Sequence, residues 1–254
     1  MKVKEYYKCR IGEKYITNEG YEIEIIEYFG YMNCTIVFND DNKTIMCNQQ
    51  YGAIVDGRIK NPNHPIVCNV GYFGQGKYKA LTEAGRTKYY RVWYSIIRRC
   101  YDKKQLEYNP SYKGCSVIKE WHNFQNFAKW FEDSYVEGWQ LDKDILIKGN
   151  KVYSPDTCCF VPQEINKIFT KTNAKRGDYP IGVSYHKRDE RYYATVQING
   201  KYKYLGSFYT PEEAFQAYKI AKENYIKDVA NRWKDLISDK VYQALINYQV
   251  EITD

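Results

Sequence analysis

The sequence predicts an α+β protein with a small N-terminal β domain, a central α+β domain, and a C-terminal three-stranded antiparallel sheet followed by a helix. Three observations lead to this class. Short apolar segments alternate with turn residues over residues 1–70, and apolar residues recur at helical spacing over 88–170. Strand-like segments within 179–235 meet at an Asn-Gly turn. A chain of 254 residues is long enough for two or three small domains.

Composition and charge bound the class of protein. The hydrophobic content of 44% and the charged content of 27% are ordinary for a globular chain, and the formal net charge of +7 favours polyanionic partners. Met1–Glu5 leads into no apolar run, and no stretch approaches the roughly 20 apolar residues of a membrane span. We therefore expect no signal peptide, no membrane partner, and eight reduced cysteines in a cytoplasmic protein.

Residues 1–70 are predicted to form a small β domain of SH3-like size. Residues 21–28 alternate imperfectly between apolar and polar, and residues 33–38 form a second apolar segment. The polar turn at 39–42 then leads to a third short segment at 44–47. Turn signals about every ten residues are typical of a small barrel or a curled sheet.

Residues 71–87 are rich in Gly and Lys, and we interpret them as a linker. The glycines lack the spacing of a phosphate-binding loop and have no strand–turn–helix context. A basic tether of this kind could follow a DNA backbone, although a flexible joint is the simpler interpretation.

The central domain, residues 88–170, is predicted to contain two amphipathic helices. Residues 88–100 place Trp93 and Ile97 at helical spacing, and residues 123–131 carry aromatic residues three and four apart. Such aromatic stripes form protein cores more often than base-stacking platforms. A further helix begins near residue 165 and leads into a basic linker over residues 171–178, whose Lys175 and Arg176 suit phosphate contacts.

Residues 179–235 predict three strands and a helix. The strands cover about 181–186, 192–198 and 201–208, and Asn199-Gly200 is a strong signal for a tight hairpin turn. Thr210 supplies a helix cap and Pro211 the first helical position. A final amphipathic helix is expected in residues 236–254, either packed on this domain or paired with another chain.

Alternation along the strands predicts two different faces for this sheet. Ala194 and Val196 point toward the helix, whereas Thr195 and Gln197 point away from it. The open face is then aromatic, amide-bearing and basic, which suits a DNA groove, although an ordinary solvated sheet is the alternative. The candidate nucleic-acid-binding residues are Tyr185, Lys187, Arg188, Arg191, Tyr193, Thr195, Gln197, Lys201, Tyr202 and Tyr204, with Lys175 and Arg176 from the linker.

This segment resembles the Apetala/ERF-type DNA-binding domain as it occurs in bacteriophage and mobile-element proteins. The resemblance is carried by Gly182-Val183, Ala194-Thr195-Val196, Leu205-Gly206-Ser207-Phe208, Glu213-Ala214 and Ala217-Tyr218. It implies a sheet that enters the major groove of duplex DNA, in a protein that acts in the bacterial host cell. The family reads bases through arginines and tryptophans, and here those positions hold Ser184, Gln197, Tyr202 and Tyr204. The DNA sequence that the family reads therefore does not carry over.

Residues 90–158 are similar to the HNH-type homing endonucleases of phages. The similarity is carried by Tyr90-Arg91-Val92-Trp93, Arg99-Cys100-Tyr101, Glu120-Trp121, Leu141-Asp142 and Tyr153-Ser154-Pro155. It implies a histidine base and a divalent metal. Here the usual Asp-His pair is Asp142-Lys143, the expected Asn is Thr157, and the distal His is missing. Lysine is protonated near neutral pH and is a poor base. We therefore expect a degenerate HNH-like domain that binds DNA without cutting it.

Two other functions stay open. The first is a magnesium-dependent endonuclease that uses Asp142, Asp144 or His122 in an unorthodox site. The second is a phage inhibitor of a host defence nuclease, such as a CRISPR effector, that acts by protein binding. A structural zinc ion is a separate possibility, with four cysteines of the central domain as ligands, although no Cys-x-x-Cys pair is present. These cysteines are Cys100, Cys115, Cys158 and Cys159.

Overall fold

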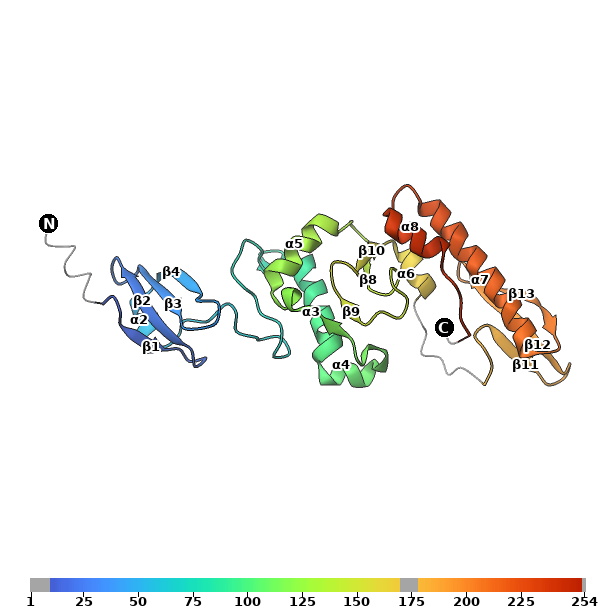
Figure 1. The fold of residues 1–254 in the computed structure, drawn as a ribbon, viewed down its shortest axis with the longest axis horizontal. Helices are drawn as coiled ribbons and strands as arrows, with labels where there is room; N and C mark the ends of the chain where they lie inside the picture. Colours follow the sequence, from blue (N-terminus) through green and yellow to red (C-terminus); the bar gives the residue numbers. More distant parts are fainter. Residues whose placement is uncertain (1–9, 170–177, 253–254) are drawn as a thin grey trace. The chain divides into compact units, whose positions relative to one another are not determined.

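The computed structural model describes residues 10–169 and 178–252 (Figure 1). It is α+β, as predicted, and divides into two compact units. The first contains the described residues up to Ser111 together with Lys119–Lys129, and the second contains Tyr112–Ile118 and the described residues from Trp130 onward. Among the described residues, no helix has the length and apolar character that crossing a membrane requires.

The first unit begins with a four-stranded antiparallel sheet in the order β1-β2-β3-β4. Its inner residues form a closed apolar core, and Ile23, Ile25 and Ile36 are fully buried there. Register shifts interrupt both the β2–β3 and the β3–β4 pairings, which is typical of a curled sheet. The elements are β1 (Lys14–Ile16), β2 (Glu22–Tyr28), β3 (Cys34–Phe38), β4 (Ile45–Gln49) and the short helix α2 (Tyr51–Val55).

The segment 71–87, expected as a linker, is ordered by contacts with other residues of the first unit. Tyr72 forms a parallel bridge with Asn123. Further on, the Gln125 side chain accepts a hydrogen bond from the Tyr78 amide and donates one to the Tyr78 carbonyl, both at 3.0 Å. The segment then forms a two-stranded hairpin, β5 (Leu81–Thr82) with β6 (Gly85–Arg86).

The helices of the first unit enclose an aromatic core. Trp93 is fully buried, and its indole N–H donates to the Trp121 carbonyl at 2.7 Å. Phe124 and Phe127 are also fully buried, so the predicted aromatic stripe is core. The helices are α3 (Lys88–Tyr101), α4 (Lys103–Tyr108), η2 (Lys119–His122) and the first part of α5 (Phe124–Ser134), whose residues from Trp130 onward belong to the second unit. A single 3-10 turn, η1 (Pro110–Tyr112), follows α4.

The second unit begins with two short strand pairs and a helix. One pair is parallel and the other antiparallel, and both are only two or three residues long. The pairs are β7 (Ser116–Val117) with β9 (Val152–Tyr153), and β8 (Gln140–Asp142) with β10 (Cys159–Val161), after which comes α6 (Gln163–Phe169).

The C-terminal sheet and helix match the prediction closely. Asn199 and Gly200 have φ of 51° and 78°, the positive values that a tight primed hairpin turn requires. Thr210 and Glu213 form a reciprocal capping box at the start of α7, with Pro211 as its first residue. The elements are β11 (Val183–His186), β12 (Arg191–Ile198), β13 (Lys201–Phe208), α7 (Pro211–Trp233) and α8 (Asp239–Ile246).

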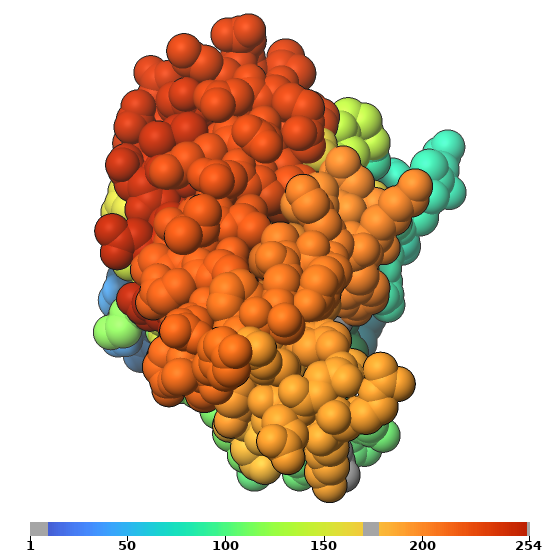
Figure 2. All heavy atoms as spheres, turned by 90° about the vertical axis from the view of Figure 1, so that its right-hand side faces the viewer, coloured from blue at the N-terminus to red at the C-terminus, as the bar shows by residue number. Residues whose placement is uncertain are grey.

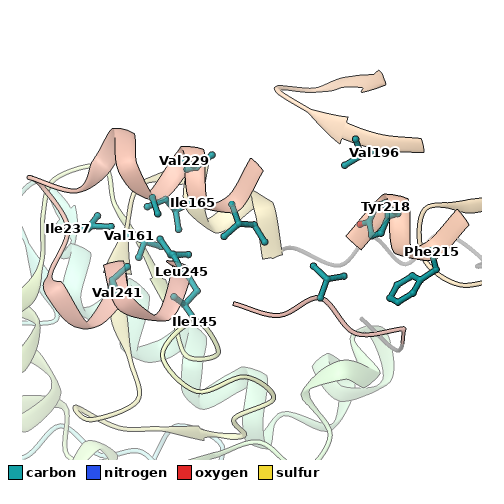
Figure 3. Close-up of a cluster of buried hydrophobic side chains, with 13 residues drawn as sticks. Ile145, Val161, Ile165, Val196, Phe215, Tyr218, Val229, Ile237, Val241 and Leu245 are labelled. Carbon is teal, nitrogen blue, oxygen red and sulfur yellow. The ribbon is translucent and has the colours of Figure 1, made fainter. Parts of the chain in front are cut away.

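Helix α7 unites the second unit through one apolar cluster (Figure 3). Its first half buries Phe215 and Tyr218 beside Val196 of the sheet. Its second half buries Val229 in the same cluster as residues of α6 and α8, including Ile165. Of the two expectations for the last helix, the structure shows the first: α8 packs back on α7.

Glu164 fastens α6 to the end of α7. Its carboxylate accepts a hydrogen bond from the indole N–H of Trp233 at 2.7 Å and also pairs with Arg232. The hydrogen bond from Trp233, together with the charge of Arg232, holds the pKa of Glu164 below its ordinary value. The ionised carboxylate is therefore the form that stabilises this junction.

Substitution of Gly182 should test how closely the sheet approaches α7. Gly182 has φ of +77°, and an added Cβ would lie 2.1 Å from Cδ2 of Tyr218. We expect Gly182→Ala to lower the free energy of unfolding by about 2–4 kcal/mol in urea denaturation. Gly200→Ala is the matched control, because its φ is +78° but its added Cβ would meet nothing within 4 Å. Equal losses in the two variants would contradict the close approach.

Substitution of Glu164 should have a pH-dependent effect. Because the folded pKa lies below the ordinary 4.5, the carboxylate contributes stability above that pH and loses the contribution as pH falls through the lowered pKa. Glu164→Gln should cost roughly 0.5–1 kcal/mol at pH 7 and progressively less below pH 4.5. Urea denaturation between pH 3 and pH 7 measures this difference, with the exposed Glu83→Gln as the control. A cost that does not change with pH would show that the charge is irrelevant.

Candidate nucleic-acid interface

A β-bulge decides which side chains of β13 reach the open face of the C-terminal sheet. Ala194 pairs with Gly206, but the next residue, Thr195, pairs with Tyr204, so Leu205 is the extra residue. An unbroken register would place Tyr204 opposite the fully buried Val196. The bulge instead turns Tyr204 to the open side, while Leu205 packs against the apolar cluster.

Aromatic rings cross the open face from β11 to β13. The rings of His186 and Tyr193 are stacked, with centroids 3.9 Å apart and an interplanar angle of 13°. Tyr193 in turn meets Tyr204 edge-on at 5.3 Å. Tyr204 is 55% exposed and Tyr202, which pairs with Gln197, is 80% exposed. Figure 2 views the second unit from the end that carries these strands (orange) and α7. In the described part of the chain, this aromatic row is therefore accessible to a ligand.

Cations surround this aromatic row. Arg191 places its guanidinium 3.4 Å from the ring centroid of Tyr209, while Lys187 and Lys201 are exposed at the ends of the strands. Arg188 is almost wholly exposed and pairs with Asp189 at 3.1 Å. The Asp189 carboxylate also accepts a hydrogen bond from the Tyr193 hydroxyl, which holds the pKa of Asp189 below its ordinary value. Asp189 therefore remains an anion that orients Tyr193.

Tyr185 does not belong to the open face. It pairs with Tyr192, and the period of two puts both rings on the side opposite Tyr193. There Tyr185 and Tyr192 lie 5.0 Å apart and form a cluster with Tyr179. The candidate residues Lys175 and Arg176 fall outside the described residues.

His186 is an aromatic residue of the open face that the candidate set lacks. It shares the face of Ser184 and Tyr193 because it lies two positions after Ser184. Strand alternation therefore contains the signal that would have found it. The bulge also has a sequence signal, since an isolated glycine such as Gly206 inside a strand favours one.

Asp142, in the segment 90–158 that is similar to HNH-type endonucleases, is engaged by the backbone of the residues that follow it. Its carboxylate accepts hydrogen bonds from the amides of Asp144 and Ile145, at 2.7 and 2.9 Å, and so caps the turn after β8. Burial raises the pKa of this carboxyl above its ordinary value. The arrangement is that of a turn-forming aspartate.

Lys143 is buried, with only 8% of its surface exposed. Its ammonium donates to the Asn150 carbonyl at 2.8 Å and pairs with Asp144, and the Asn150 amide returns a hydrogen bond to the Lys143 carbonyl. By resemblance this position would hold the histidine base of an HNH nuclease. Here the side chain ties the loop between β8 and β9 together.

The remaining candidate catalytic and metal-binding residues are divided between the units. His122 belongs to the first unit and lies edge-on to Tyr101, whereas Asp142 and Asp144 belong to the second. Cys100 is buried in the first unit, while Cys115, Cys158 and the half-buried Cys159 lie in the second.

Neither candidate set assembles into a metal site. In the described parts of the chain, no group of three or more His, Cys, Asp and Glu residues is placed to hold a metal ion. Burial raises the pKa of Cys158 to about 12, which favours the thiol over the thiolate that a zinc ion would need.

Comparisons with protein-family models, with curated proteins and with solved structures each found no match. Function is therefore inferred from the residues and contacts of this chain.

Removal of the Lys143 ammonium should destabilise the second unit. Lys143→Ala leaves the carbonyl of Asn150 without its donor, and we expect a loss of about 1–3 kcal/mol in the free energy of unfolding. Urea denaturation of the full chain measures this loss. Lys227→Ala, at an exposed position of α7, is the matched control and should change stability by less than about 0.5 kcal/mol. Equal stability of the two variants would argue against a structural role for Lys143.

Proposed function

We propose that this protein binds duplex DNA through the open face of the sheet β11–β13. The observation that carries the proposal is the division of the sheet into two unlike faces. Ala194 and Val196 are buried beneath α7, whereas the opposite face presents the row formed by His186, Tyr193 and Tyr204. A structural sheet needs only the first face, so the second is available for recognition.

The chemistry of the open face suits DNA in particular. Cations at the ends of the strands can hold phosphates, and these contacts position a protein on the duplex. Gln197 can bond to the base edge of adenine in the major groove, and the exposed Tyr202 and Tyr204 beside it offer both a hydroxyl and an apolar ring. Residues 179–209 carry five basic and two acidic residues, a net charge of +3.

The proposal includes a non-catalytic role for the nuclease-like segment. Asp142 and Lys143, at the positions where the family would have its Asp-His pair, are both engaged in hydrogen bonds within their own loop. These bonds support a scaffold in which the two positions that are catalytic in the family fix the backbone of the loop after β8. DNA recognition then falls to the C-terminal sheet.

Selection from random-sequence duplex DNA in the presence of magnesium tests both parts together. Enrichment of a sequence motif without strand breaks is the expected result. Magnesium-dependent breaks that disappear in Asp142→Ala would contradict the non-catalytic role. Neither enrichment nor retention of DNA would overturn the proposal and direct attention to a protein target.

Paired substitution on the open face should weaken sequence-specific binding. We expect Gln197→Ala with Tyr204→Ala to weaken binding to the enriched sequence about 10- to 100-fold, because a well-placed base contact contributes about 1–3 kcal/mol. Fluorescence anisotropy with the enriched and a scrambled duplex measures this loss. Tyr108→Ala with Gln243→Ala is the control, since it removes the same side-chain types from exposed positions elsewhere. Unchanged discrimination in the first variant would contradict the assignment.

A further inference from the structure

Two segments of the chain carry an excess of basic over acidic residues. Residues 77–104 contain nine basic and two acidic residues, a net charge of +7, in a chain whose total is also +7. With +3 in residues 179–209, the rest of the chain is net acidic, at −3. The larger excess thus lies in the first unit, whereas the sheet to which the proposed function was assigned belongs to the second.

The hairpin β5–β6 presents part of this charge from a fixed backbone. Thr87 closes the base of the hairpin, because its amide donates to the Ala80 carbonyl at 3.1 Å and its hydroxyl donates to the Lys79 carbonyl at 3.1 Å. The Gln125 bonds to Tyr78 anchor the segment just before it. The backbone that carries the cations of this hairpin is therefore ordered before any ligand arrives, which lowers the entropy cost of binding.

Helix α3 extends the same basic surface. Its buried face is formed around Trp93, Ile96 and Ile97, so at 3.6 residues per turn Lys88 and Arg91 point outward. The Arg86 guanidinium lies 5.9 Å from the ring centroids of Tyr90 and Tyr94, which directs it along the start of the helix.

Three cations of this surface have no carboxylate partner within the described residues. Lys79, Arg86 and Arg91 are exposed, and none of them belongs to an ion pair there. Leu81, 65% exposed, lines an open hollow at the hairpin together with Lys79, Thr82, Glu83 and Ala84. Exposed unpaired cations beside a small apolar surface match the alternating phosphates and sugars of a nucleic-acid backbone.

We propose that the hairpin β5–β6 and the outer face of α3 form a second DNA contact, which binds the sugar–phosphate backbone of the duplex without reading its sequence. The inference rests on the proposed function for the choice of duplex DNA as the ligand. It adds an attachment in the other unit, with Lys79, Arg86 and Arg91 as its phosphate-binding residues.

The salt dependence of binding tests this contact. Each phosphate contact lowers the logarithm of affinity by about 0.9 per tenfold rise in salt concentration. We therefore expect Lys79→Ala, Arg86→Ala and Arg91→Ala together to reduce the salt slope by about 2–3, with the same sequence motif enriched. Fluorescence anisotropy of the full chain with random-sequence and enriched duplexes, over a series of NaCl concentrations, measures the slope.

The matched control removes three exposed cations from the second unit, in the combination Lys227→Ala, Lys234→Ala and Lys240→Ala. It changes the net charge equally and should leave the slope within about 0.5 of the original value, because long-range charge effects are screened by salt. Equal slopes in the two triple variants would overturn the proposal. Tighter binding of single-stranded than of duplex DNA of the same sequence would also overturn it.

The outcomes separate this inference from the proposed function. A reduced slope in the hairpin variant, without sequence enrichment by the unsubstituted protein, would support the second contact and contradict reading by the sheet. Enrichment that depends on Gln197 and Tyr204, with an unchanged slope in the hairpin variant, would support the sheet and contradict the second contact.

Discussion

The second unit depends on the apolar packing of α7. This helix has 23 residues, and at 1.5 Å per residue it is about 34 Å long, so its two halves can serve different partners. Phe215 and Tyr218 cover the inner face of the sheet, while Ile226 and Val229 lie in the same cluster as residues of α6 and α8. One helix thus buries the apolar face of the sheet and joins the sheet to α6 and α8 through the same core.

The same packing determines the surface that is offered to a ligand. Once α7 covers one face, every side chain of opposite parity on β12 must be exposed or half-buried. The bulge at Leu205 then adds Tyr204 to that set without removing Leu205 from the core. A change of register by one residue would exchange the two faces of β13. The pairing that places the correct side chains in the core therefore also determines which side chains form the candidate interface.

Local signals predicted the parts of the fold that local interactions form. Asn199-Gly200 and the Thr210 cap specify backbone geometry within four residues, and both occur as expected. Contacts between distant residues were not predictable in this way. The hydrogen bonds between Gln125 and Tyr78 join residues 47 positions apart in the sequence. They order a segment whose composition alone predicts a linker.

The candidate site shows the same division. Strand alternation predicted Thr195 and Gln197 on the open face, and the same rule, applied along β11, separates His186 from Tyr185. The burial of Lys143 had no signal in the sequence, because lysine is rarely buried and its partner, the Asn150 carbonyl, is a backbone group available at any residue. The resemblance to HNH-type endonucleases drew attention to position 143, but the structural role of Lys143 is seen only in its contacts.

Two proposed DNA contacts on separate units have a consequence that neither has alone. Binding of one unit raises the effective concentration of the other near the same duplex, and overall affinity then exceeds that of either contact by a factor set by the connection between them. A sequence-independent backbone contact also retains the chain on DNA while the sheet samples successive sites. Under these two proposals, a sheet with tyrosines and a glutamine, where the resembling family has arginines and tryptophans, needs to supply only selectivity, because the second basic surface supplies affinity.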